Sequence, residues 1–237
     1  MYNKTSPIAP VFGIRKDVSE STDARVFNVR CRDCARLHRF LKTVRRDHPG
    51  YWARPVPAFG DPRARLLVVG LAPGMHGANS TGRPFTGDTA GELLYRTLHQ
   101  FGFASHTGSD DPRDGLRLRD CRVTNAVKCL PPHNKPDGIE VRNCNRYLAA
   151  EIAMQRPRAI LALGAVAHRA VLQSLGLKPG ALPFAHGKVH DLTAMRSPAR
   201  LYDSYHCIRY NTQTRRLTAG MFEAVLREIK SFLSSSR

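Results

Sequence analysis

Long apolar runs are missing from this sequence of 237 residues. No stretch approaches the roughly 18 consecutive apolar residues that a membrane-spanning helix needs. Residues 1–25 mix proline, serine and charged side chains, and they contain no apolar segment of signal-peptide length. We therefore expect a cytoplasmic protein with no membrane partner, built as an N-terminal arm (1–25) and one folded domain (26–237).

Acidic residues are also scarce. Asp and Glu number 19 against 37 Lys and Arg, which gives a formal net charge of +18. Such a surplus favours a polyanionic partner over a neutral metabolite. Arginine supplies 29 of the 37 basic residues, and its planar guanidinium binds phosphates and stacks on bases. Charge alone therefore predicts nucleic acid or another acidic surface as the partner.

Internal repeats and linkers are absent, so nothing divides the chain further. Apolar runs typical of buried strands occur at 66–70, 123–127, 159–164 and 201–206. Helical patterns lie between them, and a final amphipathic helix over 218–233 directs five side chains inward: Phe222, Val225, Leu226, Ile229 and Phe232. This alternation predicts an α/β fold with a central, mainly parallel, four-stranded sheet covered on both faces. Ligands of such sheets bind beyond the carboxyl ends of the strands, so we expect a cleft there.

The segment GLAPGMHGANSTGRPFTGD, residues 70–88, follows the first strand and leads into a helix. It holds five glycines and two prolines. With so few side chains, its backbone amides can approach a ligand closely. The segment closes on Asp88, for which two roles are open: an N-cap for the helix that begins near residue 89, or a chemical role in the cleft.

Four of the six cysteines have a spacing that suits metal binding. Cys31 and Cys34 are separated by two residues, and Cys129 and Cys144 by fourteen. Because the cytoplasm keeps thiols reduced, metal ligation is favoured over disulfides. Ligand type does not distinguish zinc from an iron–sulfur cluster, since both accept four cysteines. Buried, inert side chains are expected for the remaining two, Cys121 and Cys207.

Three motifs occur in the chain together with these four cysteines. They are the loop at 70–88, the segment TNAVKCLPP at 124–132 with NKP at 134–136, and SYH at 204–206 followed by Arg209, NT at 211–212 and LT at 217–218. In this order, from about residue 31 to the last helix, the chain resembles the family 5, or type b, uracil-DNA glycosylases. The resemblance implies a three-layer α/β/α sandwich. It also implies a monofunctional base-excision repair enzyme that hydrolyses the N-glycosidic bond of uracil and other deaminated bases in DNA, such as hypoxanthine, xanthine and ethenocytosine.

The resemblance further implies a [4Fe–4S] cluster held by Cys31, Cys34, Cys129 and Cys144. One departure stands out, because Cys207-Ile208 follows the histidine where the family commonly has Pro-Ser. The shape of the loop that enters DNA is therefore open, and so is the substrate range. We expect the protein to act on DNA as a monomer.

A base inside a duplex must be extruded into a pocket and stacked on a ring before it can be excised. Within this resemblance Phe85 is the stacking platform, although a core role for this aromatic side chain is the alternative. The backbone at Gly70, Ala72 and Gly74 would line the base pocket. Asn125 would pair with the base edge through its side-chain amide.

Breaking the glycosidic bond leaves an anionic base and a cation-like sugar, so catalysis must stabilise both charges. His206 would donate a hydrogen bond to the departing base, unless it is a solvated surface histidine. Asp88 would steady the sugar cation and position water, and Asn125 would assist. DNA would be gripped by Arg209 and Arg83, with a basic rim supplied by Lys128, Lys135, Arg215 and Arg216.

Two other functions compete with this one. A non-catalytic, metal-stabilised nucleic-acid-binding module would explain the charge and the cysteines, but it would not need a glycine-lined pocket with Phe85 and Asp88. A related enzyme that has changed its reaction at Cys207 would retain the same scaffold.

Overall fold

The computed structural model describes residues 27–194 and 200–235. The expected N-terminal arm at 1–25 lies outside these residues. One mixed sheet is formed by β1 (Phe59–Gly60), β2 (Leu66–Gly70), β3 (Cys121–Asn125), β4 (Ala159–Leu163), β5 (Val189–Asp191) and β6 (Arg200–Ser204). The helices are α2 (Ala35–Asp47), α3 (Ala78–Thr81), α4 (Thr89–Gln100), the 3-10 turn η1 (Pro132–Asn134), α5 (Gly138–Gln155), α6 (Ala165–Ser174), α7 (Arg209–Gln213) and α8 (Ala219–Ser234).

The strands are ordered β1-β3-β2-β4-β6-β5. The four central strands, β3, β2, β4 and β6, are parallel to one another, which confirms the predicted parallel core. Antiparallel strands β1 and β5 extend the two edges. These edge strands were not predicted, because two and three residues are too few to show an alternating pattern.

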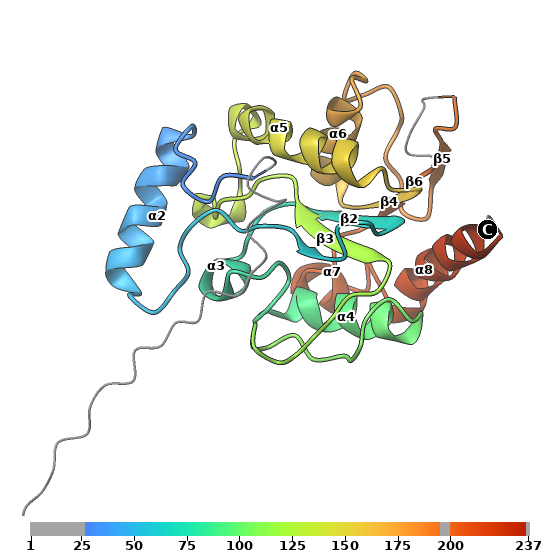
Figure 1. Ribbon diagram of the computed structural model, residues 1–237, viewed down its shortest axis with the longest axis horizontal. Helices are drawn as coiled ribbons and strands as arrows, with labels where there is room; N and C mark the ends of the chain where they lie inside the picture. Colours follow the sequence, from blue (N-terminus) through green and yellow to red (C-terminus); the bar gives the residue numbers. More distant parts are fainter. Residues whose placement is uncertain (1–26, 195–199, 236–237) are drawn as a thin grey trace, which may run out of the picture.

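Strand β2 shows how the sequence builds three layers. Its residues are all buried, and successive side chains point to opposite faces. Leu66 and Val68 pack in one apolar cluster with α4 and α8. Leu67 and Val69 pack in another with α5 and α6. Figure 1 shows α5 and α6 above the sheet and α4 and α8 below it, so the predicted α/β/α sandwich is confirmed.

Helix α8 buries most of the predicted face, but not Phe232. Phe222, Val225, Leu226 and Ile229 are buried, and Leu233 takes the last interior position. The ring of Phe232 is only partly buried, and the guanidinium groups of two arginines lie over it, those of Arg158 and Arg200. The last turn of the helix therefore points its aromatic side chain toward two arginines at the amino ends of β4 and β6.

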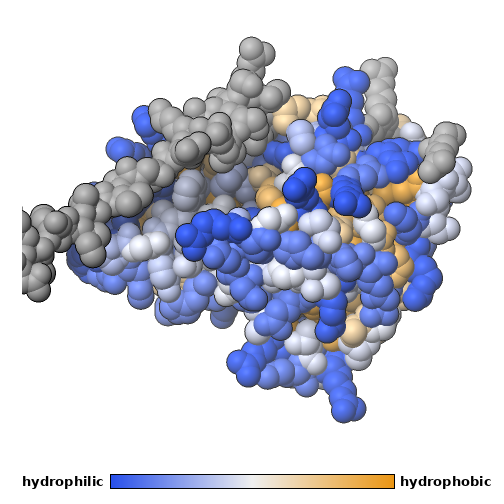
Figure 2. Space-filling view, turned by 60° about the horizontal axis from the view of Figure 1, so that its bottom comes forward, coloured by the Kyte–Doolittle hydropathy of each residue, from blue (hydrophilic) through white to orange (hydrophobic). Residues whose placement is uncertain are grey.

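The order of the strands determines where a ligand can bind. Strand β2 has β3 on one side and β4 on the other, so the connections that follow neighbouring strands diverge at its carboxyl end. A crevice forms where connections diverge in this way. No helix in the described part of the chain is long and apolar enough to cross a membrane. The face shown in Figure 2 is covered mainly by hydrophilic residues, with smaller apolar areas between them.

Candidate active site

A cavity of about 580 Å³ opens beyond the carboxyl ends of the parallel strands. The loop after β2, the end of β3, the start of α6 and the segment after β6 supply its walls. Four side chains predicted from the sequence line it together: Phe85, Asp88, Asn125 and His206. The volume lies in the range of pockets that enclose a small organic ligand. Segments far apart in the chain therefore meet around one cavity, as the sequence predicts.

Asp88 lies at the junction of the glycine-rich loop and α4. One oxygen, Oδ1, accepts a hydrogen bond from the backbone N–H of Gly91 at 3.1 Å, so the capping role is confirmed. The other oxygen, Oδ2, crowds two glycines of the loop: a Cβ on Gly77 would lie only 2.2 Å from it, and one on Gly74 3.3 Å. Burial raises the pKa of Asp88, and the backbone N–H groups of Gly91 and Ala90 oppose that rise.

The same loop lacks side chains for a second reason, the close packing around Phe85. A Cβ on Gly70 would lie 2.5 Å from Cζ of Phe85 and 2.4 Å from Oδ1 of Asn125. A Cβ on Gly91 would lie 1.9 Å from the carbonyl oxygen of Phe85. Phe85 itself has a φ of 53°, a left-handed conformation that is uncommon for a bulky residue. The glycines thus allow the loop to fold tightly against its own functional side chains.

His206 follows the end of β6, and its ring stacks on that of Phe85, with centroids 5.7 Å apart and planes at 23°. Burial lowers the pKa of His206 to about 4, so the imidazole is neutral at pH 7. Its Nδ1 is buried and has no hydrogen-bond partner within the described structure. The Asn211 side-chain amide donates to the His206 carbonyl at 2.8 Å and holds this turn in place.

Asn125 ends β3 directly beside Gly70, the last residue of β2. Only 4% of its surface is exposed. Gly70 and two further residues of the adjoining loop were predicted to line a base pocket. Of these, Ala72 and Gly74 line the cavity, whereas Gly70 lies behind it against Phe85 and Asn125.

A profile of the Uracil DNA glycosylase superfamily matches residues 57–230. The chain belongs to this superfamily. A Type-5 uracil-DNA glycosylase of Thermus thermophilus is 48% identical over 206 residues, covering 84% of this chain and 92% of that protein. A Type-5 uracil-DNA glycosylase of Pyrobaculum aerophilum is 43% identical, and the match covers 84% of this chain and 87% of that protein. A Type-4 uracil-DNA glycosylase of the same organism is 31% identical, and the match covers 73% of this chain and 82% of that protein.

The open side of the cavity in this superfamily member carries large exposed side chains. Ile208 is 43% exposed and Tyr210 is 65% exposed, and Arg209 lies between them. All three line the cavity mouth at the start of α7. The sequence predicted a role for Arg209 alone. A signal was present for Ile208, which stands at a position where the family commonly has serine; none was seen for Tyr210.

Two of the predicted DNA-binding cations lie elsewhere. Arg83 is only 6% exposed, and its guanidinium donates to Asp114 at 2.6 and 2.8 Å. Lys128 is 1% exposed, and its ammonium binds both carboxylate oxygens of Glu151. Each charge is already neutralised inside the protein, so neither residue belongs to a basic rim. Exposed positions are found for the other predicted cations, Lys135, Arg215 and Arg216.

Four cysteines line a second, smaller hollow between α2, the end of β3 and α5: Cys31, Cys34, Cys129 and Cys144. N–H groups point at three of the four sulfurs, from Arg146 to Cys31, from Asn143 to Cys34 and from the Lys128 backbone to Cys144. No three cysteine sulfurs in the described structure lie within 4.8 Å of one another. The predicted set is therefore gathered around one hollow, but its sulfurs are spread apart.

The other two cysteines are buried in the apolar cluster beneath α4 and α8, as predicted. Burial raises the pKa of Cys207, and the nearby charge of Asp88 adds to this rise. A thiol held in its neutral form is a weak nucleophile. The geometry therefore gives no support to a reaction that has moved to Cys207.

Proposed function

We propose that this chain is a monofunctional DNA glycosylase that hydrolyses the N-glycosidic bond of uracil in DNA, the first step of base-excision repair. One observation carries the proposal: Phe85, Asp88, Asn125 and His206 line one cavity although they come from three separate segments. The names of the Type-5 and Type-4 relatives agree with uracil as substrate. A binding module would have no need of this constellation.

The chemistry assigns each charge of the transition state to one side of the cavity. As the glycosidic bond breaks, its electron pair leaves with the base, and positive charge develops on the sugar. His206, neutral because its pKa is about 4, donates a hydrogen bond to the base oxygen where negative charge gathers. Asp88 stabilises the sugar cation and orients a water, whose oxygen bonds to C1′ and whose released proton restores the neutral base.

The other residues that line the cavity recognise the extruded base. The Phe85 ring stacks on the base, and the Asn125 amide bonds to its edge. Backbone groups at Ala72 and Gly74 complete the base-binding wall, with Gly70 keeping Phe85 and Asn125 in place from behind. The wall at Ala72 and Gly74 offers no polar side chain that selects one base edge. For that reason we extend the proposal to hypoxanthine, xanthine and ethenocytosine.

A lyase step is not part of the proposal. Such a step needs an amine that attacks the sugar carbon. None of the described residues that line the cavity is a lysine, and the nearby Lys128 is bound to Glu151. The product is therefore an intact abasic strand.

DNA binding is proposed for the mouth of the cavity. Ile208 and Tyr210 form an exposed apolar pair that can wedge between base steps, while Arg209 binds phosphate or enters the helix beside them. Ile208 stands where the family commonly has serine, so this apolar side chain departs from the family pattern. We expect the enzyme to act as a monomer on cytoplasmic DNA.

A [4Fe–4S] cluster is proposed for the cysteine hollow. A single zinc ion with four thiolates at about 2.3 Å requires sulfurs about 3.8 Å apart. The wider spread of the described sulfurs, no three of which lie within 4.8 Å, suits a larger inorganic core. N–H groups aimed at the sulfurs are also typical of such sites. The cluster, when bound, would tie α2 to α5 and the end of β3, at a distance from the reaction.

One assay tests the function. Purified protein is incubated with an oligonucleotide that carries one uracil, and the strand is then treated with alkali. We expect strand breakage only after alkali, since an abasic site is alkali-labile and no lyase step occurs. An intact strand after alkali would favour the non-catalytic binding module, and breakage without alkali would contradict the monofunctional reaction.

A further inference from the structure

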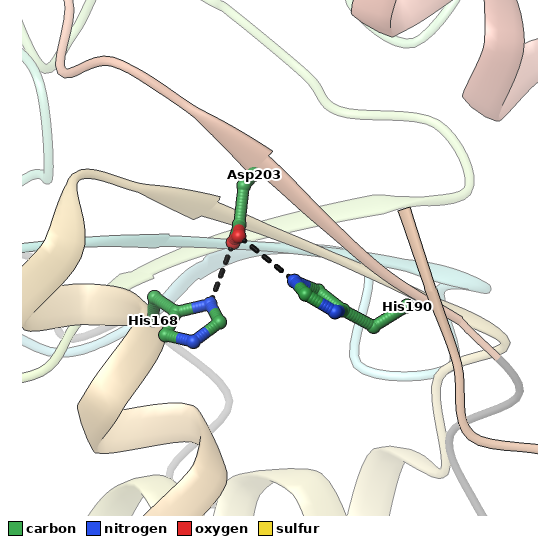
Figure 3. Close-up of side chains that lie close together, drawn as sticks. All are labelled: His168, His190 and Asp203. Carbon is green, nitrogen blue, oxygen red and sulfur yellow. Dashed lines mark hydrogen bonds and ion pairs between the residues drawn. The ribbon is translucent and has the colours of Figure 1, made fainter. Parts of the chain in front are cut away.

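A buried trio of polar side chains lies close to the cavity but outside it. His168 of α6 and His190 of β5 both bind Asp203 of β6 (Figure 3). His168 Nδ1 lies 2.8 Å from Oδ1 of Asp203, and His190 Nε2 lies 3.0 Å from Oδ2. All three residues are buried. The mechanism proposed above uses none of them.

The hydrogen bonds of the trio fix its protons. His168 Nε2 lies 2.9 Å from the carbonyl oxygen of Leu182, which can only accept, so this nitrogen carries a proton. The other nitrogen shares a proton with Asp203, and imidazole is the more basic of the two groups. Burial lowers the pKa of His168, but the hydrogen bond and charge of Asp203 outweigh it, and the net pKa is raised. Both ring nitrogens of His168 therefore face oxygen acceptors, an arrangement that favours a ring protonated on both nitrogens.

Two histidines and a carboxylate are also a set that binds transition metals. Here the two rings contact opposite oxygens of Asp203 at hydrogen-bond lengths, 2.8 and 3.0 Å. Both carboxylate oxygens of Asp203 are satisfied by these N–H groups. The geometry is therefore that of a hydrogen-bonded ion pair, and a metal is an outcome that the experiment below must exclude.

The trio is connected by the backbone to two walls of the cavity. Gly164, the N-cap of α6, donates to the Ser204 carbonyl at 2.8 Å, and its own carbonyl accepts from the His168 N–H at 3.0 Å. A Cβ on Gly164 would lie 3.7 Å from Cβ of His206. Asp203 is three residues before His206, and His168 is one helical turn after Gly164. The side-chain bond between them therefore fastens α6 to the end of β6 next to the cavity.

We propose that Asp203, through His168 and His190, is a positioning residue that sets His206 against the α6 wall of the cavity. This inference rests on the proposed function for its kinetic consequence only. Without the charged bond, β6 and α6 keep their backbone link but lose the contact that fixes their relative position. A shift of about 1 Å at a reacting group costs roughly 10²-fold in rate.

The first experiment compares Asp203→Asn with Asp120→Asn. The control breaks the ion pair of Asp120 with Arg65, which lies at the opposite end of the sheet. We expect Asp203→Asn to lower kcat for a uracil oligonucleotide by about 10- to 100-fold, as for residues that orient a functional group, with KM changed far less. Asp120→Asn should leave kcat near the wild-type value. Equal kcat values for the two variants would overturn the proposal.

A second pair of variants covers the case in which Asp203→Asn does not fold. His190→Gln retains an amide that can donate to Asp203, whereas His190→Leu does not. We expect kcat to fall for His190→Leu and to be largely restored in His190→Gln. Equal losses in both variants would contradict the proposed hydrogen bond.

A third readout does not depend on activity. Nitrogen NMR of the wild-type protein at pH 7 should show His168 with both ring nitrogens protonated, and His190→Leu should shift the ring signals of His206. A neutral His168, or one metal ion bound to the trio in metal analysis, would overturn the proposal. An inactive wild-type enzyme with these NMR signatures would refute the glycosylase function alone.

Discussion

A methyl group on Gly77 would lie 2.2 Å from Oδ2 of Asp88, nearer than a carbon and an oxygen approach without bonding. The loop before α4 therefore carries no side chain at Gly77 because the carboxylate of its own last residue lies against that position. The position of the Asp88 carboxylate therefore depends on the absence of a Cβ atom at residue 77.

Gly77→Ala is expected to displace the Asp88 carboxylate and to lower kcat by roughly 10²-fold, the effect of about 1 Å of misplacement. Gly220→Ala is the matched control, because a Cβ there meets nothing within 4 Å. Single-turnover kinetics on a uracil oligonucleotide measures the effect. Wild-type rates in Gly77→Ala would contradict the role of this close approach.

Asp88→Asn is expected to lower kcat by about 10²- to 10⁴-fold, because an amide supplies no charge to the sugar cation. DNA affinity should change little, since the loss falls on the transition state. Asparagine still caps α4, so the thermal midpoint should be kept, whereas Asp88→Ala should cost a further ~1 kcal/mol of stability. A wild-type rate in Asp88→Asn would leave this residue with its capping role alone.

The acid limb of the pH–rate profile should report the same carboxylate. Burial raises the pKa of Asp88 above its ordinary value, so kcat should fall with decreasing pH earlier than an ordinary aspartate predicts. The measurement is kcat against pH at saturating DNA. A profile that stays flat down to the ordinary pKa of aspartate would argue that Asp88 need not be ionised.

His206 is expected to stay neutral between pH 8 and 5, because burial lowers its pKa to about 4. An unfolded chain binds this proton near pH 6.5. The stability that comes from the neutral ring is therefore complete above pH 6.5 and is lost as the pH falls toward 4. Proton NMR of the ring follows the titration, with the urea-unfolded protein as control, and a midpoint near 6.5 in the folded protein would contradict it.

Tyr210→Ala is expected to reduce uracil excision from duplex DNA by at least about tenfold, since unstacking a base step costs a few kcal/mol. Excision from single-stranded DNA should fall less, because no base pair must be opened. Met154→Ala removes another exposed apolar side chain, which lies on α5 and does not line the cavity, and serves as control. Equal losses on both substrates would exclude the wedge.

Cys144→Ser is expected to remove iron and acid-labile sulfide from the purified protein and to lower its thermal midpoint, because the ligand set ties three segments together. Cys121→Ala, which alters a cysteine buried in the core, should retain both. Metal and sulfide analysis of the two variants decides the matter. One zinc per chain in the wild type, with no sulfide, would replace the cluster with a single ion.

Local sequence patterns determined much of this protein. The apolar runs predicted the four parallel strands, because a buried strand needs apolar side chains on both faces. The capping position of Asp88 likewise depends on the start of the adjoining helix, whereas Gly70 is required by a contact with the distant Asn125. The cysteine spacing and the three motifs were enough to identify the family, which the superfamily match and the Type-5 relatives together confirm. How the segments meet at one cavity followed from a general rule for parallel sheets.

Tertiary structure alone decided which charges remain available. Arg83 and Lys128 were expected to contact DNA, yet Asp114 and Glu151 neutralise them from 31 and 23 residues away. Asp203 also has its charge partners far away in the chain: the two histidines that bind it lie 35 and 13 residues from it. A sequence gives the charge of a side chain, but its partner and its burial exist only after folding brings distant segments together.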